Sequence, residues 1–135
     1  GVTVAARRAE AIEELRPVAA GLGVPLAGVP WDSALRLLDR DVVISTVPKG
    51  VADPLVRAGR FGAGPEPRFG RSTVVFDALY DPWPTPLAAT AQAHGCRIVS
   101  GLDLLLAQAL GQFTQFTGVP APVDAMRAAL HAARA

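Results

Sequence analysis

Two adjacent arginines, Arg7 and Arg8, stand where an apolar strand pattern, Val2–Ala5, gives way to a helical one. In a dinucleotide-binding sheet, a carboxylate at the end of such a strand accepts the 2′-hydroxyl of NAD, whereas arginine accommodates the 2′-phosphate of NADP. This strand ends without an acid, and cations at a helix N-terminus oppose the helix dipole. A bound phosphate removes that penalty and accepts guanidinium contacts. The two arginines are therefore either cofactor ligands or solvated surface residues, and the pair alone leaves both readings open.

A second group, Ser45, Thr46 and Val47, follows the β-branched run Val42–Ile44. Ligands of open parallel sheets bind beyond the carboxyl ends of the strands, so backbone amides and small hydroxyls here are placed to touch a cofactor. A Ser/Thr turn at a strand exit is also common without any ligand.

Tyr80 lies on a loop stiffened by Pro82, Pro84 and Pro86. Its hydroxyl is suited to donate a hydrogen bond to a carboxylate or a ring hydroxyl of a substrate. The alternative is a tyrosine that packs on a neighbouring proline with its hydroxyl in water.

Beyond Gly101, a helical pattern carries an amide stripe formed by Gln108, Gln112 and Gln115, at positions i, i+4 and i+7. Such a stripe is usually a solvated face, and Gln112 and Gln115 are interpreted in that way. The opposite side is apolar and comprises Leu102, Leu105, Leu106, Ala109, Leu110, Phe113 and Phe116.

Strand and helix patterns alternate along the chain, which predicts a partial Rossmann-like, doubly wound parallel α/β sheet with two C-terminal helices. We expect Val42–Ile44 to be a buried strand because of its β-branched density. A short helix ending at Leu38 is expected to be capped by Asp32 or Ser33, and Gly59–Arg71 is expected to be a mobile surface loop. The predicted strands are Val2–Ala5, Pro25–Val29, Val42–Ile44, Ser72–Phe76 and Cys96–Val99, and the other predicted helices are Ala9–Gly21, Val51–Ala58, Pro86–His94, Leu102–Thr117 and Val123–Ala133.

Bulk properties exclude several classes of protein. The 135 residues include 13 basic and 12 acidic side chains, a formal charge of +1 that favours neither nucleic acid nor an anionic membrane. No apolar run reaches the roughly 18 residues of a membrane span, and no secretory signal opens the chain. The lone Cys96 is interpreted as a buried, reduced thiol in a cytoplasmic protein, and one Cys with two distant His residues argues against a zinc site. A start without Met, directly in a strand pattern, suggests a piece of a longer protein.

Two segments in order, Asp77–Leu87 and Ser100–Gln108, resemble the C-terminal half of the shikimate dehydrogenase family. There, a D-x-x-Y-x-P-x-x-T-P-L loop and a D-G-L-x-M-L-x-x-Q helix both reach the active site. The resemblance implies reversible hydride transfer between NADPH and the C3 carbonyl of 3-dehydroshikimate, with shikimate as the product. The family's catalytic Lys and Asp, and its Gly-rich phosphate turn, belong to residues upstream of the matched region. No catalytic residue is therefore assigned in this chain.

The resemblance also implies roles for individual residues. Ser100 stands where the family motif has an acid, and Asp103 stands at the first position written x, where the family has a glycine. Arg8 replaces a threonine in the family's N-R-T-x-x-R turn. The implied cofactor ligands are Arg7, Arg8, Ser45, Thr46, Val47, Leu79, Gly101 and Leu104, and the implied substrate ligands are Tyr80 and Gln108.

Residues 1–100 are thus expected to form a partial NADP-binding domain, and residues 101–135 to form helices that pack on an N-terminal substrate domain of the same protein or on another copy of the chain. The 135 residues alone are expected to be inactive. The alternative is a stand-alone Rossmann-like module that binds a nucleotide or a partner without catalysis. An NAD-linked, quinate-using relative is disfavoured by Arg7 and Arg8.

Overall fold

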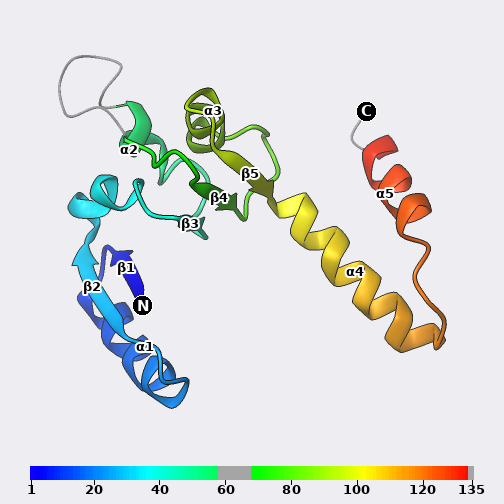
Figure 1. The fold of residues 1–135 in the computed structure, drawn as a ribbon, viewed down its shortest axis with the longest axis horizontal. Helices are drawn as coiled ribbons and strands as arrows, with labels where there is room; N and C mark the ends of the chain where they lie inside the picture. The colour runs from blue at the N-terminus through cyan, green and yellow to red at the C-terminus, as the bar shows by residue number, and fades with distance from the viewer. Residues whose placement is uncertain (58–67, 134–135) are drawn as a thin grey trace.

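The computed structural model describes residues 1–57 and 68–133. Most of the predicted loop Gly59–Arg71 lies outside the described residues. Strands and helices alternate as predicted (Figure 1). The strands are β1 (Val2–Ala6), β2 (Leu26–Pro30), β3 (Val42–Ser45), β4 (Val74–Asp77) and β5 (Arg97–Ser100). The helices are α1 (Ala9–Gly21), the 3-10 helix η1 (Trp31–Leu37), α2 (Asp53–Arg57), α3 (Pro86–Ala93), α4 (Gly101–Thr117) and α5 (Val123–Ala132).

The five strands form two hydrogen-bonded sheets, both parallel. One pairs β1 with β2, and the other has the order β3-β4-β5. In the second sheet, Val43, Val75 and Ile98 are aligned in register, and so are Ser45, Asp77 and Ser100. The parallel pairing places the carboxyl ends of β3, β4 and β5 at one edge, which confirms the predicted α/β class.

The principal core lies on one face of the β3-β4-β5 sheet, where α2, α3 and the end of η1 cover it. Val75 is fully buried, and Val43 and Ile98 pack against the same cluster because residues aligned across neighbouring strands lie on the same face of the sheet. The buried members are Leu38, Ala52, Val56, Val75, Leu87, Ala91 and Cys96. The expectation of a buried thiol at Cys96 is confirmed.

The opposite face of this sheet is largely open, which corrects the expectation that Val42–Ile44 is buried. Val42 is 58% exposed and Ile44 is 64% exposed. Among the described residues, β3 has a single strand neighbour, β4, and only the face that carries Val43 is packed. The β-branched composition of Val42–Ile44 therefore predicts a strand correctly, but it does not predict whether both faces of that strand are buried.

The 3-10 helix η1 also differs from the prediction. It begins at Trp31 after an extended Pro30, and no side chain caps it, so neither Asp32 nor Ser33 has the predicted role. Pro30 ends β2 directly before it, and this leaves no room for a separate capping residue.

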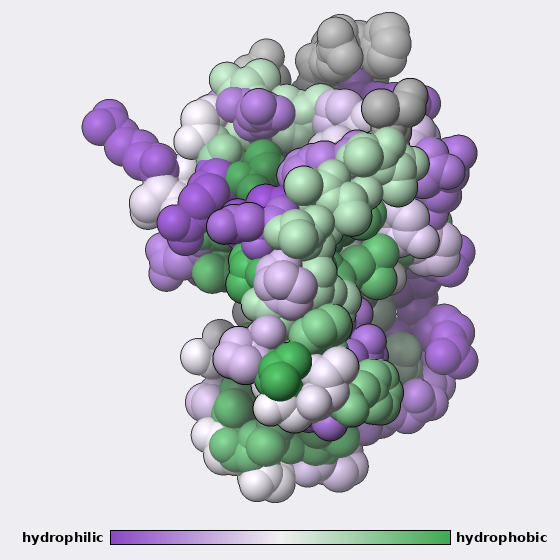
Figure 2. Space-filling model, turned by 90° about the vertical axis from the view of Figure 1, so that its right-hand side faces the viewer, coloured by the Kyte–Doolittle hydropathy of each residue, from purple (hydrophilic) through white to green (hydrophobic). Residues whose placement is uncertain are grey.

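Helices α4 and α5 form an arm that leaves the sheet. Figure 1 shows α4 running away from the end of β5 and α5 returning beside it. Figure 2 views the molecule from this side, and apolar surface extends over much of the face. Leu104 and Leu105 are each 42% exposed and Phe116 is 85% exposed, so the apolar side of α4 is only partly covered by α5. No helix of the described residues is long and apolar enough to cross a membrane.

Candidate functional site at the carboxyl edge of the sheet

Three aligned polar residues end the strands of the larger sheet. Ser45, Asp77 and Ser100 are the last residues of β3, β4 and β5, and each is buried. A buried polar group costs free energy unless it has a hydrogen-bond partner. The partners of these three residues therefore show what each strand end does.

Ser45 differs from the other two because its side chain makes no hydrogen bond within the described residues. Its hydroxyl is buried and has no hydrogen-bond partner among residues 1–57 and 68–133, while its carbonyl accepts a hydrogen bond from Ala78 N at 2.9 Å. Thr46 and Val47 follow it, the first exposed and the second half-buried against the core. An unsatisfied hydroxyl at the carboxyl edge is what a site prepared for a polar ligand group presents.

Asp77 is satisfied by the loop that follows it. One carboxylate oxygen accepts a hydrogen bond from Leu79 N at 3.2 Å, and the other accepts one from the Thr85 hydroxyl at 2.7 Å. Thr85 is in turn the N-cap of α3, where its Oγ1 accepts a hydrogen bond from Ala88 N at 3.1 Å. The loop that carries Tyr80 is therefore tied at both of its ends.

Gly101 joins this loop to the arm. Its amide donates to Leu79 O at 3.3 Å, and a Cβ at this position would overlap the carbonyl oxygen of Ala78. The predicted cofactor ligands Leu79 and Gly101 are thus brought into direct contact. Only glycine allows this approach of the two backbones.

Ser100 and Asp103, the two departures from the family pattern, form a capping box on α4. The Asp103 carboxylate accepts hydrogen bonds from Ser100 N at 2.7 Å and from Ser100 Oγ at 2.6 Å, and Ser100 Oγ accepts one from Asp103 N. The hydrogen bond from the Ser100 side chain holds the pKa of Asp103 below its ordinary value, and the positive charges of His131 and Arg127 on α5 act in the same direction. The start of α4 therefore retains a carboxylate, that of Asp103, one helical turn after the position where the family has its acid.

The remaining predicted ligands of this edge, Tyr80, Leu104 and Gln108, are exposed on the loop after β4 and on α4. Tyr80 is 48% exposed on its loop, Leu104 is 42% exposed on the first turns of α4, and Gln108 is exposed. Gln108 lies about 10 Å along the helix axis from Gly101, at 1.5 Å per residue. The structure thus brings Leu79, Gly101 and Ser45 together at the edge, and leaves the Tyr80 and Gln108 side chains accessible near it.

Arg7 and Arg8 lie on the other sheet, where β1 ends and α1 begins. Arg8 is the N-cap residue of α1 and makes no side-chain capping bond, so the expected cation at the helix start is present. Arg7 lines a hollow of about 310 Å³ between α1 and β2, together with Arg16. Arg16 is paired with Glu13 at 2.7 Å, whereas within residues 1–57 and 68–133 neither Arg7 nor Arg8 forms an ion pair. The two guanidinium groups are therefore available to an anion.

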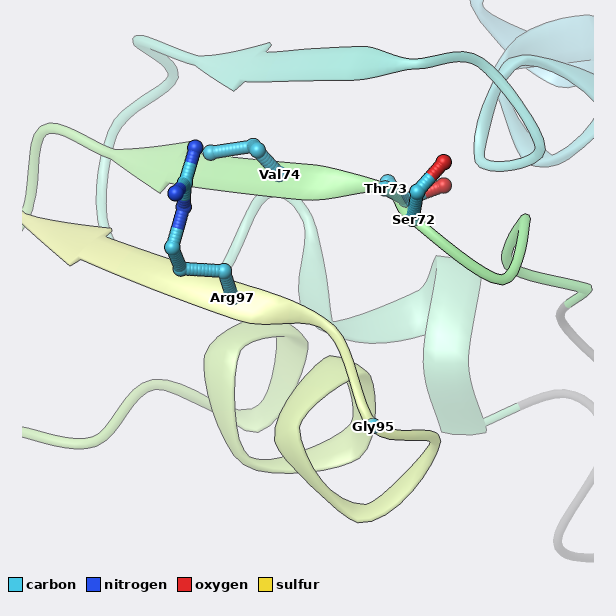
Figure 3. A pocket seen from close by; sticks show the side chains of 5 residues that line it. All are labelled: Ser72, Thr73, Val74, Gly95 and Arg97. Atoms are coloured by element: carbon cyan, nitrogen blue, oxygen red, sulfur yellow. The ribbon is translucent and has the colours of Figure 1, made fainter.

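A second hollow, of about 320 Å³, lies away from these residues, at the amino ends of β4 and β5 (Figure 3). It is lined by Ser72, Thr73, Val74, Gly95 and Arg97. The Arg97 side chain reaches toward Val74 and away from the two hydroxyls, and Thr73 Oγ1 already donates to Arg40 O at 2.8 Å. This end of a parallel sheet is opposite to the one where ligands bind.

Sequence reasoning missed two features of the site. The tie from Asp77 to Thr85 was not predicted, although a Thr directly before Pro86 is a recognisable helix start. The capping box was also missed, although Ser100 and Asp103 have its three-residue spacing. Both signals are local and predict helix starts. The contact between the Asp77 carboxylate and Thr85 is set by the loop conformation.

Comparisons with known proteins identify one family of relatives. Residues 101–131 match the family model described as the C-terminal domain of shikimate 5'-dehydrogenase. A curated NADP(+) shikimate dehydrogenase of Anaeromyxobacter dehalogenans is 39% identical over 97% of this chain and 45% of its own length. The crystal structure of Mycobacterium tuberculosis shikimate dehydrogenase superimposes with a TM-score of 0.73 at 42% identity, over 96% of this chain and 46% of that one. A shikimate 5-dehydrogenase of Mycobacterium fortuitum gives a TM-score of 0.75 at 36% identity, over 94% and 45% of the two chains. The chain spans less than half the length of these relatives.

Proposed function

Because the chain belongs to the shikimate dehydrogenase family, whose C-terminal part it matches, we propose that it supplies the NADP-binding side of an enzyme that interconverts 3-dehydroshikimate and shikimate in the cytoplasm. The observation that carries the proposal is the carboxyl edge of the β3-β4-β5 sheet. There the unsatisfied Ser45 hydroxyl and the joined backbones of Leu79 and Gly101 lie at the ends of adjacent parallel strands. The curated relatives carry NADP(+) in their names.

The residues present fit the two ends of such a cofactor. Arg7 and Arg8, at the start of α1, suit the 2′-phosphate because they offer two guanidinium groups without ion-pair partners in the described residues. Gly101 is assigned to the nicotinamide end because it begins α4 at the carboxyl edge, against the backbones of Ala78 and Leu79, with Leu104 one turn beyond it. When bound, the nicotinamide of NADPH supplies the hydride.

The middle of the cofactor has to be held by other residues. A dinucleotide-binding sheet has the strand order 3-2-1-4-5-6, and its first βα turn supplies the amides that bind the pyrophosphate. The observed orders, β2-β1 and β3-β4-β5, correspond to 3-2 and 4-5-6. Among the described residues, no strand takes the position between β1 and β3, which in such a sheet belongs to the strand that precedes the pyrophosphate turn. We accordingly expect these 135 residues alone to bind NADPH weakly and to show no dehydrogenase activity.

Tyr80 and Gln108 are assigned to the substrate. Both side chains are exposed near the carboxyl edge, and a phenol and an amide offer the hydrogen bonds that a polyhydroxylated carboxylate requires. We assign both to holding the substrate rather than to transferring protons. They hold the substrate in place while groups outside the described site carry the proton.

A chimera tests the proposal directly. In it, this chain replaces the corresponding C-terminal residues of the Mycobacterium tuberculosis relative, and the assay follows NADPH oxidation with 3-dehydroshikimate. We expect activity from the chimera and none from the chain by itself. A folded chimera that binds neither NADPH nor substrate would refute the proposal, whereas one that binds NADPH without turnover would support the binding-module alternative.

The cofactor ligands are tested in the same chimera. Replacement of Arg7 and Arg8 together by Ala should weaken NADPH binding by about 1.5–3 kcal/mol for each charged hydrogen bond to the 2′-phosphate that is removed, and should leave NADH binding nearly unchanged. Arg57→Ala is the matched control, because Arg57 pairs with Asp53 at 3.0 Å on α2 and is assigned no ligand. An equal decrease in affinity for NADPH and NADH would remove the 2′-phosphate assignment.

The substrate ligands have a different signature. Gln108→Ala should raise the KM for shikimate and leave the Kd for NADPH unchanged. Gln112→Ala, on the same exposed stripe one turn further along, should change neither. Collapse of NADPH binding in Gln108→Ala would instead assign that residue to the cofactor site or to the helix structure.

A further inference from the structure

Asp77 is a buried carboxylate to which no role has been assigned. It is 1% exposed, and both of its oxygens accept hydrogen bonds from the loop that follows β4. Within the described residues it forms no ion pair, so these bonds are what compensates its burial. An apolar residue at this position would bury more cheaply, and the carboxylate therefore points to a function of the bonds themselves.

The two bonds close the loop onto the end of its own strand. Leu79 lies at the beginning of the loop and Thr85 at its end, and one carboxylate binds both at 3.2 and 2.7 Å. Thr85 also caps α3, so the loop cannot move at this end without uncapping that helix. Tyr80 lies between the two tied points and shares their constraint.

The same loop fixes the start of α4. The carbonyl of Leu79, whose amide binds Asp77, accepts the amide of Gly101 at 3.3 Å. The carbonyl of Ala78 fills the place of a Gly101 side chain. Because α4 begins at Gly101, a displacement of the loop is transmitted to the helix that carries Leu104 and Gln108.

We infer that Asp77 is a positioning residue that holds the Tyr80 loop and the first turn of α4 as one unit, so that the substrate ligands on both elements keep a fixed mutual geometry. This inference rests on the proposed function, since it concerns how that site is held. Asp77 does not itself contact substrate or cofactor. Asp77 acts on the site through its hydrogen bonds with Thr85 and Leu79. Removal of either bond should therefore weaken substrate binding by Tyr80 and Gln108, which Asp77 does not contact.

The test compares two buried threonines at the two ends of β4. Thr85→Val removes the hydroxyl that donates to Asp77, and Thr85→Ser restores it. Thr73→Val is the matched control, because Thr73 is buried like Thr85 (1% and 6% exposed) and its hydroxyl donates to Arg40 O at 2.8 Å, next to the amino end of β4. In the chimera, Thr85→Val should raise the KM for shikimate by roughly tenfold, the equivalent of one hydrogen bond to a charged group. Thr85→Ser and Thr73→Val should retain the KM of the parent chimera.

A second measurement does not depend on enzymatic activity. In this chain alone, Thr85→Val should accelerate hydrogen exchange of the Leu79 and Gly101 amides by about tenfold, and Thr73→Val should not. Unchanged exchange at Gly101 in Thr85→Val, or equal KM values for Thr85→Val and Thr73→Val, would overturn the inference. An inactive parent chimera would count against the proposed function only, because the exchange result still decides whether Asp77 ties the two elements.

Discussion

The β3-β4-β5 sheet and the α4–α5 arm have similar apolar content but opposite surroundings. In the core on the packed face of the sheet, Val75 of β4 and Leu87 of α3 are at most 2% exposed. On the arm, Leu105 is 42% exposed and Phe116 is 85% exposed, and Gly101 is the only buried residue of either helix. The sheet is thus stabilised on one face by contacts within the chain, whereas the described residues leave much of the apolar side of the arm exposed.

The same substitution in the two regions gives the largest expected contrast. Leu87→Ala should lower the unfolding free energy of the chain by about 2–5 kcal/mol, because it leaves a cavity in the core. Leu105→Ala should change it by less than about 0.5–1 kcal/mol, because that side chain is half in solvent. Urea denaturation followed by circular dichroism measures both, and similar decreases would mean that the arm is packed as well as the sheet.

The joint between the two regions is tested by a pair of glycines on one helix. Gly101→Ala should cost about 1–3 kcal/mol, since the added methyl overlaps the Ala78 carbonyl. Gly111→Ala, in the middle of α4 with nothing within 4 Å of its Cβ position, should stabilise the chain by about 0.5–1 kcal/mol. Urea denaturation should therefore show a lower unfolding free energy for Gly101→Ala and a higher one for Gly111→Ala. A neutral Gly101→Ala would show that loop and helix are not in close contact.

The capping box at this joint should give a smaller effect that depends on pH. The pKa of Asp103 is lowered in the folded chain from its ordinary 3.8, so the charged form contributes stability above that pH. That contribution disappears as the pH falls from about 4 through the depressed pKa. Asp103→Asn should therefore be less stable than the parent by about 1 kcal/mol at pH 6, and the difference should shrink toward about pH 3. Denaturation series at both pH values measure this, and a difference independent of pH would exclude the carboxylate as the stabilising group.

The end of the arm should show the smallest change in folding stability. Phe116→Gln should alter the unfolding free energy by less than about 0.5 kcal/mol. Exposed apolar patches drive association, so the same variant should shift the chain toward a smaller species in sedimentation velocity. Identical sedimentation of both proteins over a range of concentrations would show that Phe116 takes no part in self-association.

The contrast between the regions also explains what the sequence could predict. Periodicity located every strand and helix of the described residues within a few positions, because alternation and helical spacing are local properties. It failed for the burial of Val42 and Ile44, because burial depends on which element covers a face, and β-branched residues form strands with or without a cover. The surface-facing interpretation of Gln112 and Gln115 is confirmed, since both are exposed.

The site was predictable to a different extent. The positions of Gly101, Leu79 and Ser45 at one edge follow from strand ends in a parallel sheet, and the structure places them there. The replacement of the family's acid by Ser100 suggests in the sequence that the carboxylate is missing. The structure shows that the Asp103 carboxylate accepts hydrogen bonds from Ser100, an arrangement whose three-residue spacing is already present in the sequence. All the ligand roles remain predictions, both those of the cofactor residues such as Arg7, Ser45 and Gly101 and those of the substrate residues Tyr80 and Gln108.

The two buried polar residues that bracket Val75 also bear on how β4 selects its pairing. In a strand of only four residues, a shift of one position would turn Val75 out of the core and is rejected by hydrophobicity. A shift of two positions keeps the same face inward and escapes that penalty. It would, however, place Thr73 or Asp77 between Val43 and Ile98, away from the Arg40 carbonyl or the Thr85 hydroxyl. The hydrogen bonds of Thr73 and Asp77 therefore exclude the registers shifted by two positions, which the apolar pattern alone would allow. This short strand has a single register as a result.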